Sequence, residues 1–152
     1  MMLTSPAGRA LVRRSEGKRN AAYRDTTGRW TIGIGHARGV TAGMLLDDDQ
    51  VERLFESDIR ECEDMIGRLV KVPLTQGQFD ALVDFTFQFG ETKFAASTLL
   101  RVLNQGLYVE AAAQLARWIY ADGKPDNGLK ARRAADIALW NSGQQTKFLA
   151  AT

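Results

Sequence analysis

Apolar residues recur at three- and four-residue steps between positions 47 and 70, a pattern typical of one long amphipathic helix. Asp47 and Gln50 have the spacing of a capping box at its start, and Pro73 follows its end. The apolar stripe consists of Val51, Leu54, Phe55, Ile59, Cys62, Ile66 and Leu69. Charged residues, Glu63 among them, fill the other positions, and we expect them to face solvent.

The next segment is apolar on nearly all sides. Thr75 and Gln78 form a second capping box, and Gly90 is a suitable C-terminal stop. A helix that is apolar all round is normally buried. The segment therefore predicts the central helix of the core, with Phe79 and Phe85 as core residues.

Shorter helices are predicted at both ends of the chain. Ser5 and Pro6 suit the start of a first helix, with Gly17 as its stop. A short helix should follow Ser97 and stop near Gly106. Another helix is predicted from Val109 to Tyr120, stopped at Gly123, and a last helix from Leu129 to about Asn141, ended by Gly143. The tail from Gln144 carries no clear signal.

Between the first two helices the pattern changes to that of a β-hairpin. A strand begins near Tyr23, residues 26–29 form a turn, and Trp30 resumes a strand. We also expect a third short strand around residues 32–35. A turn centred on Gly28 would place Asp25 and Thr31 directly opposite each other, with Cβ atoms roughly 4.5–5.5 Å apart. A carboxylate and a hydroxyl at that distance can hold a water.

Glu16 falls in the last turn of the first helix, where the negative end of the helix dipole disfavours a carboxylate. The pKa of Glu16 should therefore be raised, as a general acid requires. One protonated and one ionised carboxyl group are the usual machinery of glycoside hydrolysis. Two alternatives remain open from spacing alone. Asp25 could simply cap its turn, and Glu16 could belong to a solvated charge cluster with neighbouring basic residues.

Composition narrows the possible functions. The chain has 152 residues and a net charge of +2, which suits one compact unit or two small lobes. This weak basicity favours contact with an anionic polymer such as bacterial cell wall, and no motif indicates a nucleic-acid binder. The single cysteine, Cys62, fits a core position in a protein without disulfides. We see no metal-ligand cluster, transmembrane span or signal peptide.

The order Glu16, Asp25, Thr31, followed by Ile32-Gly33-Ile34-Gly35-His36, resembles the catalytic segment of the phage lysozymes of glycoside hydrolase family 24. The resemblance continues in the segments 78–90, 97–106 and 128–133. It implies an α+β, lysozyme-like fold in a single domain over 1–152. A small lobe would span about 15–46, a connecting helix about 47–70, and a helical lobe about 71–143 together with the N-terminal helix.

The resemblance also implies an activity. The enzyme would hydrolyse the β-1,4 bond between N-acetylmuramic acid and N-acetylglucosamine in peptidoglycan, with inversion and without a cofactor or metal. Glu16 would be the acid, Asp25 the base, and Thr31 would help to hold the water. His36 would pair with Asp58 beside the site. Phe87, Gln88 and Arg133 would be substrate-binding residues. Arg132 and Arg133 would lie near the cleft, where either could bind wall-peptide carboxylates or merely solubilise the last helix.

The implied biology is that of an endolysin. We expect a monomer that stays in the host cytoplasm before lysis, has no stable membrane insertion, and depends on a holin to reach the periplasmic wall. Two rivals stay open: a lytic transglycosylase acting on the same bond, and a wall-binding relative without activity. The pairing of Asp25 with Thr31 argues against the first, because a water-holding pair would have no task there.

Overall fold

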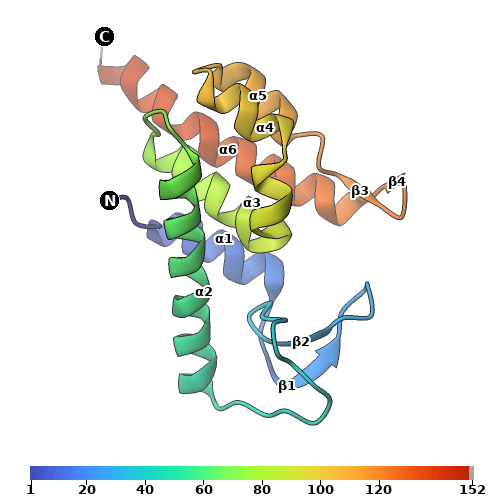
Figure 1. The fold of residues 1–152 in the computed structure, drawn as a ribbon. Coiled ribbons are helices and arrows are strands. Elements are labelled where there is room, and N and C mark those ends of the chain that lie inside the picture. Colours follow the sequence, from blue (N-terminus) through green and yellow to red (C-terminus); the bar gives the residue numbers. More distant parts are fainter. Residues whose placement is uncertain (151–152) are drawn as a thin grey trace.

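The protein is described by a computed structural model, which covers the backbone of residues 1–150 and the side chains of residues 1–143. The last two residues of the predicted domain, and the side chains of the tail from Gln144, lie outside this description. A small hairpin of β1 (Arg19–Arg24) and β2 (Trp30–Gly33) lies at one end, and a group of helices at the other (Figure 1). The long helix α2 (Asp48–Leu69) runs between them.

The helical part contains α1 (Pro6–Glu16), α3 (Gln76–Ala95), α4 (Thr98–Asn104), α5 (Tyr108–Leu115) and α6 (Asn127–Ala150). The predicted caps are confirmed: Ser5 accepts a hydrogen bond from the Gly8 amide, and α2 and α3 both begin with complete capping boxes. In the part of the chain described here, no helix is both long and apolar enough to cross a membrane.

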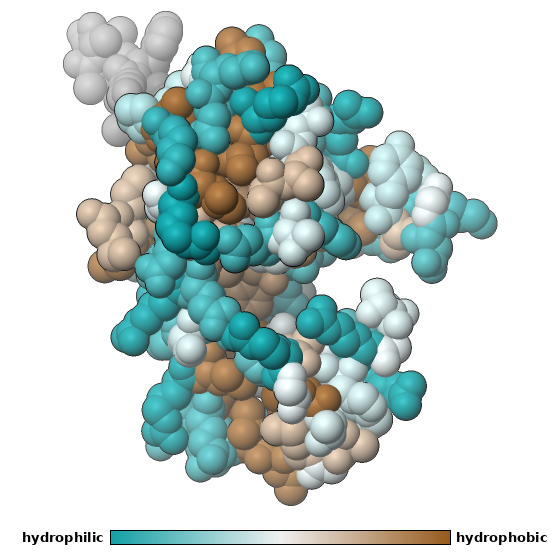
Figure 2. Space-filling model, viewed as in Figure 1, coloured by the Kyte–Doolittle hydropathy of each residue, from teal (hydrophilic) through white to brown (hydrophobic). Residues whose placement is uncertain are grey.

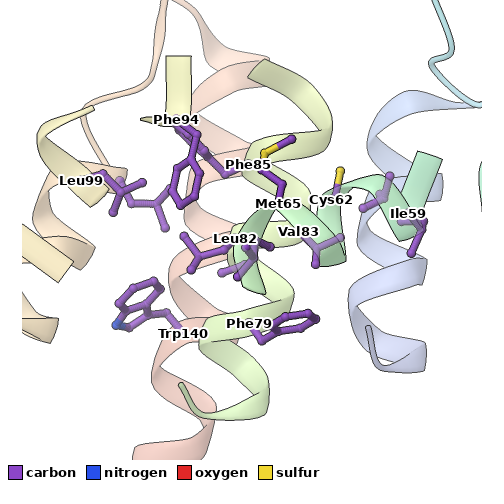
Figure 3. Packing of buried hydrophobic residues seen from close by; sticks show 14 of the residues in the cluster. Ile59, Cys62, Met65, Phe79, Leu82, Val83, Phe85, Phe94, Leu99 and Trp140 are labelled. Carbon is purple, nitrogen blue, oxygen red and sulfur yellow. The ribbon is translucent and has the colours of Figure 1, made fainter. Parts of the chain in front are cut away.

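Helix α3 is the centre of the core, as its all-round apolar pattern predicted. Leu82, Val83 and Phe85 are fully buried, and residues from α2, α4 and α6 pack around them (Figure 3). Helix α6 approaches α3 closely at Gly77, where a Cβ atom would lie 1.9 Å from the Leu139 carbonyl oxygen. Glycine at this crossing is required by space.

Gly143 also serves packing, and the prediction that it ends the last helix is wrong. The helix begins at Asn127, where the Asp126 side chain accepts a hydrogen bond from the Leu129 amide at 2.8 Å, and its backbone continues to Ala150. A Cβ atom on Gly143 would lie 3.1 Å from the Thr75 Cβ, so the missing side chain lets the two segments approach.

The helix predicted up to Tyr120 is also wrong at its C-terminal end. Helix α5 ends at Leu115, and Tyr120 begins a small hairpin of β3 (Tyr120–Ala121) and β4 (Lys124–Pro125). Asp122 and Gly123 form its turn with φ angles of 50° and 75°. An Asp-Gly pair is a strong signal for a two-residue hairpin, and it was available in the sequence.

The predicted stop at Gly90 is confirmed: its φ of 83° and ψ of 175° are not helical, and a second short helical segment follows up to Ala95. Two smaller predictions need correction. No third strand forms at residues 32–35; isolated bridges join Ile32 to His36 and Ala21 to Leu45 instead. Glu63 does not face solvent: it is 5% exposed, because its carboxylate accepts hydrogen bonds from the Thr4 amide and hydroxyl.

The surface is hollowed between the two parts of the molecule. Figure 2 shows an opening on the side where β3 and β4 project above the β1–β2 turn. We call this opening the cleft.

Candidate active site

Glu16 is the last residue of α1, and Gly17 ends the helix with a φ of 70°. The Glu16 side chain is 19% exposed, and Glu16 Oε1 accepts a hydrogen bond from Arg132 Nη1 at 2.9 Å. Burial raises the pKa of Glu16, while the Arg132 charge and hydrogen bond act in the opposite direction. The predicted direction is therefore right, but burial is the main cause.

Gly35 lies beside the other oxygen of the Glu16 carboxyl group. A Cβ atom at this position would lie 2.5 Å from Glu16 Oε2, and the φ of Gly35 is 66°. Both the space and the backbone conformation therefore require glycine. Gly35 therefore lets the backbone after β2 lie directly against the Glu16 carboxyl group.

Asp25 lies just beyond the end of β1, in the turn of the hairpin. Its Oδ1 accepts hydrogen bonds from the Thr27 hydroxyl at 2.6 Å, the Thr27 amide at 2.8 Å and the Arg29 amide at 2.9 Å. These bonds, that of the Thr27 hydroxyl above all, lower the pKa of Asp25. No described residue donates a hydrogen bond to Oδ2. The capping role is thus real, and it orients an ionised carboxylate with one oxygen left over.

Thr31 is not directly opposite Asp25, so this prediction of register is wrong. The strands pair Tyr23 with Thr31 and Arg24 with Trp30, which leaves Asp25 bonded to Arg29 across the turn. The turn is therefore centred on Thr27, one residue earlier than predicted, because Asp25 pairs with Arg29 and closes the turn. Asp25 and Thr31 are then diagonal neighbours on the same face of the hairpin. The Cα atoms of such neighbours are about 7–8 Å apart, so the gap between the two side chains is larger than predicted.

Comparison with known proteins now bears on these residues. The family sequence model described as "Phage lysozyme" matches residues 13–136, which include Glu16, Asp25 and Thr31. The chain belongs to the phage lysozyme family. It is a glycoside hydrolase of the lysozyme type, and the proteins similar to it carry the names endolysin, muramidase and lysozyme.

Three similar proteins illustrate this family assignment. An endolysin of Acyrthosiphon pisum secondary endosymbiont phage 1 is 40% identical over 145 residues, covering 93% of this chain and 99% of the relative. Among solved structures, the muramidase domain of SpmX from Asticaccaulis excentricus has a TM-score of 0.82 at 34% identity, covering 92% of this chain and 98% of that one. A P22 lysozyme mutant has a TM-score of 0.78 at 39% identity, covering 93% and 100%.

The predicted pair beside the site of this lysozyme is present. His36 Nδ1 lies 2.7 Å from Asp58 Oδ2, and His36 Nε2 lies 2.9 Å from the Arg38 carbonyl oxygen. Burial raises the pKa of Asp58, opposed by its hydrogen bond with His36. Because His36 follows Gly35 directly, this pair anchors the backbone turn beside the Glu16 carboxyl group to α2.

Neither arginine of the last helix solubilises it. Arg132 and Arg133 have side-chain exposures of 9% and 2%, and both extend from α6 towards α3. Arg133 Nη2 donates to Gln88 Oε1 at 2.7 Å, and its Nε lies 2.9 Å from Asp136 Oδ2. A guanidinium enclosed in this way has no surface for a sugar, so Arg133 is not a direct substrate contact in this arrangement.

Phe87 and Gln88 remain accessible in part. Phe87 is half-buried, and its ring centroid lies 5.9 Å from that of Phe55. Gln88 is half-buried as well and holds Arg133. These two are the members of the predicted substrate-binding set that the structure leaves partly exposed.

Asp84 of α3 is fully buried, and it was not predicted as a site residue from the sequence. Arg132 binds it through Nε at 3.0 Å and Nη2 at 2.8 Å. A signal was available, because an aspartate within an all-round apolar helix must find a buried partner. The sequence could not say which cation it would be.

Proposed function

We propose that this lysozyme hydrolyses the β-1,4 bond between N-acetylmuramic acid and N-acetylglucosamine in peptidoglycan, with Glu16 as the general acid and Asp25 as the general base. The observation that carries the proposal is the opposite tuning of the two carboxyl groups. Burial raises the pKa of Glu16, and hydrogen bonds lower that of Asp25. These opposite shifts separate the two pKa values and so widen the pH range in which Glu16 is protonated while Asp25 is ionised.

The roles follow from this difference. Glu16 donates its proton to the glycosidic oxygen as the bond breaks. Asp25 accepts a proton from a water that attacks the anomeric carbon, and the Thr31 hydroxyl helps to hold this water. Attack from the face opposite the leaving group inverts the configuration, which requires carboxyl groups about 6.5–9.5 Å apart so that a water fits between them.

The test is to analyse fragments released from purified peptidoglycan in ¹⁸O-labelled water. We expect reducing muramic-acid ends that carry one labelled oxygen, and NMR of the fresh product should show the α-anomer. Anhydro-muramic ends would contradict the proposal and indicate a lytic transglycosylase. Protein bound to the wall without any release would indicate a binding relative that lacks the activity.

We propose that Phe87 and Gln88 contact the glycan. Both are half-buried residues of α3 that follow the buried segment of this helix. Phe87→Ala and Gln88→Ala should each raise KM several-fold and leave kcat nearly unchanged. A fall in kcat with KM unchanged would contradict this role.

We propose that the enzyme acts as a monomer and reaches the wall through the pore of a holin. The support is its resemblance to phage endolysins. Expression in a bacterial host with and without a holin tests the second point, since lysis should require both proteins. Sedimentation of the purified enzyme tests the first.

A further inference from the structure

Behind Glu16, a chain of ionic contacts extends away from the cleft into the interface of α3 and α6. Arg132 links Glu16 to Asp84, Asp84 Oδ2 lies 3.5 Å from Arg133 Nη2, and Arg133 is paired with Asp136. Asp84 and Asp136 are both 0% exposed. The acid is thus the outermost carboxyl group of a largely buried network.

The geometry of Arg132 divides its hydrogen bonds between two acids. Its Nε and Nη2 both donate to Asp84, at 3.0 and 2.8 Å, and Nη1 donates to Glu16 Oε1 at 2.9 Å. The two bonds to Asp84 fix the plane of the guanidinium group. Glu16 therefore receives one bond on Oε1, and its Oε2 lies beside Gly35.

We propose that Asp84 is a positioning residue for the reaction: by holding Arg132 from behind, it limits Glu16 to one guanidinium hydrogen bond and leaves Oε2 as the oxygen that carries the transferable proton. The inference rests on the proposed role of Glu16 as the acid. Asp84 has no surface in the cleft and acts only through Arg132.

The division of the Arg132 hydrogen bonds between two acids matters, because an arginine paired with Glu16 alone would favour the ionised form of Glu16. Asp84 takes two of the three bonds, and its own negative charge further raises the pKa of Glu16. The other charged or titratable neighbours that affect Glu16 or Asp84 are Asp25, Tyr23, Arg133 and Asp136. Burial raises the pKa of Asp136, and the negative charge of Asp84 acts in the same direction.

The first test is Asp84→Asn, which keeps the shape and one acceptor oxygen but removes the charge. Arg132 then interacts more strongly with Glu16, and Asp136 can ionise to balance the two arginines. We expect the basic limb of the pH profile of kcat/KM to move down by about one pH unit, since an opposite charge nearby shifts a carboxyl pKa by this order. Activity above the limb should fall about tenfold.

The matched control is Asp80→Asn. Asp80 lies one turn earlier on α3 and is 2% exposed, but it binds Ser5 and Gln76 and has no contact with Arg132. This variant should lose stability and keep the wild-type pH profile. If Asp84→Asn behaves in the same way, Asp84 is only structural and the inference is overturned.

Arg132→Lys gives a second variant with the opposite expectation. A lysine ammonium cannot bind Asp84 through two parallel bonds and reach Glu16 as well, so Glu16 loses its partner and the basic limb moves up. Opposite shifts from two destabilising variants cannot result from destabilisation itself. Shifts in the same direction would contradict the inference.

Direct titration of Glu16 separates this inference from the proposed function. The ¹³C carboxyl resonance of Glu16, assigned by its loss in Glu16→Gln, should titrate at lower pH in Asp84→Asn than in the wild type. An unchanged titration overturns the inference whatever the activity. Full activity of Glu16→Gln would overturn the proposed acid instead, and it would do so independently of the titration.

Discussion

The two carboxyl groups of the site are placed in opposite surroundings. Glu16 ends a helix and is enclosed by Arg132 from the far end of the chain and by the turn at Gly35. Asp25 lies on an exposed hairpin turn, and residues within four positions of it supply its hydrogen bonds. Tertiary packing therefore sets the direction of the Glu16 pKa shift, and local backbone geometry sets that of Asp25.

This difference explains why the site lies between two structurally unlike parts. Burial is the main cause of the raised pKa of Glu16, and residues from both parts of the molecule, Arg132 and Gly35, lie against its carboxyl group. Lowering the pKa of Asp25 requires only aimed hydrogen-bond donors, which a tight turn provides by itself. A short hairpin is therefore sufficient for Asp25, whereas Glu16 needs both parts.

The largest effect should come from removing either member of the pair. Glu16→Gln and Asp25→Asn should each lower kcat by about 10²–10⁴-fold, the usual contribution of general acid or base catalysis. Initial rates of peptidoglycan cleavage measure this loss. Glu16→Gln should unfold at the same or a higher denaturant concentration than the wild type at neutral pH, because it removes a buried acid. A variant that loses activity only by unfolding would not support the assignment.

A substitution at Gly35 should displace the Glu16 carboxyl group. Gly35→Ala places a Cβ atom on Glu16 Oε2 and should lower kcat by about 10²-fold, the cost of displacing a catalytic group by about 1 Å. Gly39→Ala is the matched control: its φ of 73° imposes the same backbone strain, but a Cβ atom there meets nothing within 4 Å. Equal losses in the two variants would attribute the effect to strain alone.

The opposite tuning should appear in the pH profile of the wild type. In the proposed mechanism, the active form has Asp25 ionised and Glu16 protonated. Activity should therefore rise as pH increases through the Asp25 pKa, which is below its usual value, and fall as pH increases through the Glu16 pKa, which is above its own. Measurement of kcat/KM should give a broad bell, and a narrow one would contradict the comparison.

The smallest effect should come from the turn. Thr27→Val removes the hydroxyl that contributes most to lowering the Asp25 pKa, so the acidic limb of the profile should move up by a fraction of a pH unit. The basic limb should stay in place. Thr26→Val, whose side chain makes no hydrogen bond to Asp25 in the described structure, is the control. A shift of the basic limb in Thr27→Val would mean that the two groups are not tuned separately.

Much of the fold could be predicted from local signals. The capping boxes at Asp47 and Thr75 and the Ser5 cap determine where helices begin, and all three are confirmed. Helix ends were less predictable, because glycine has two uses. Gly17 ends α1, whereas Gly143 lies within a helix to allow close packing, and the sequence alone does not distinguish them.

The site was predictable in its residues and less so in its causes. The direction of the Glu16 pKa could be predicted from its position on the helix, but burial dominates, and burial depends on what packs above the residue. The network of Arg132, Asp84 and Asp136 could not be predicted, since partners of buried charges are chosen by helix packing. The predicted hairpin register was wrong, because Asp25 bonds to Arg29 and takes part in the turn instead of pairing with Thr31.

The hydrogen bond between the Glu16 and Arg132 side chains joins residues 116 positions apart in the chain. A ribosome makes Glu16 early and Arg132 near the end, so an incomplete chain contains both carboxyl groups of the cleft but lacks the helix that encloses the acid. The surroundings of Glu16 are therefore completed only when α6 docks on α3. Synthesis and folding thus delay the shift of this carboxyl pKa until the chain is nearly complete.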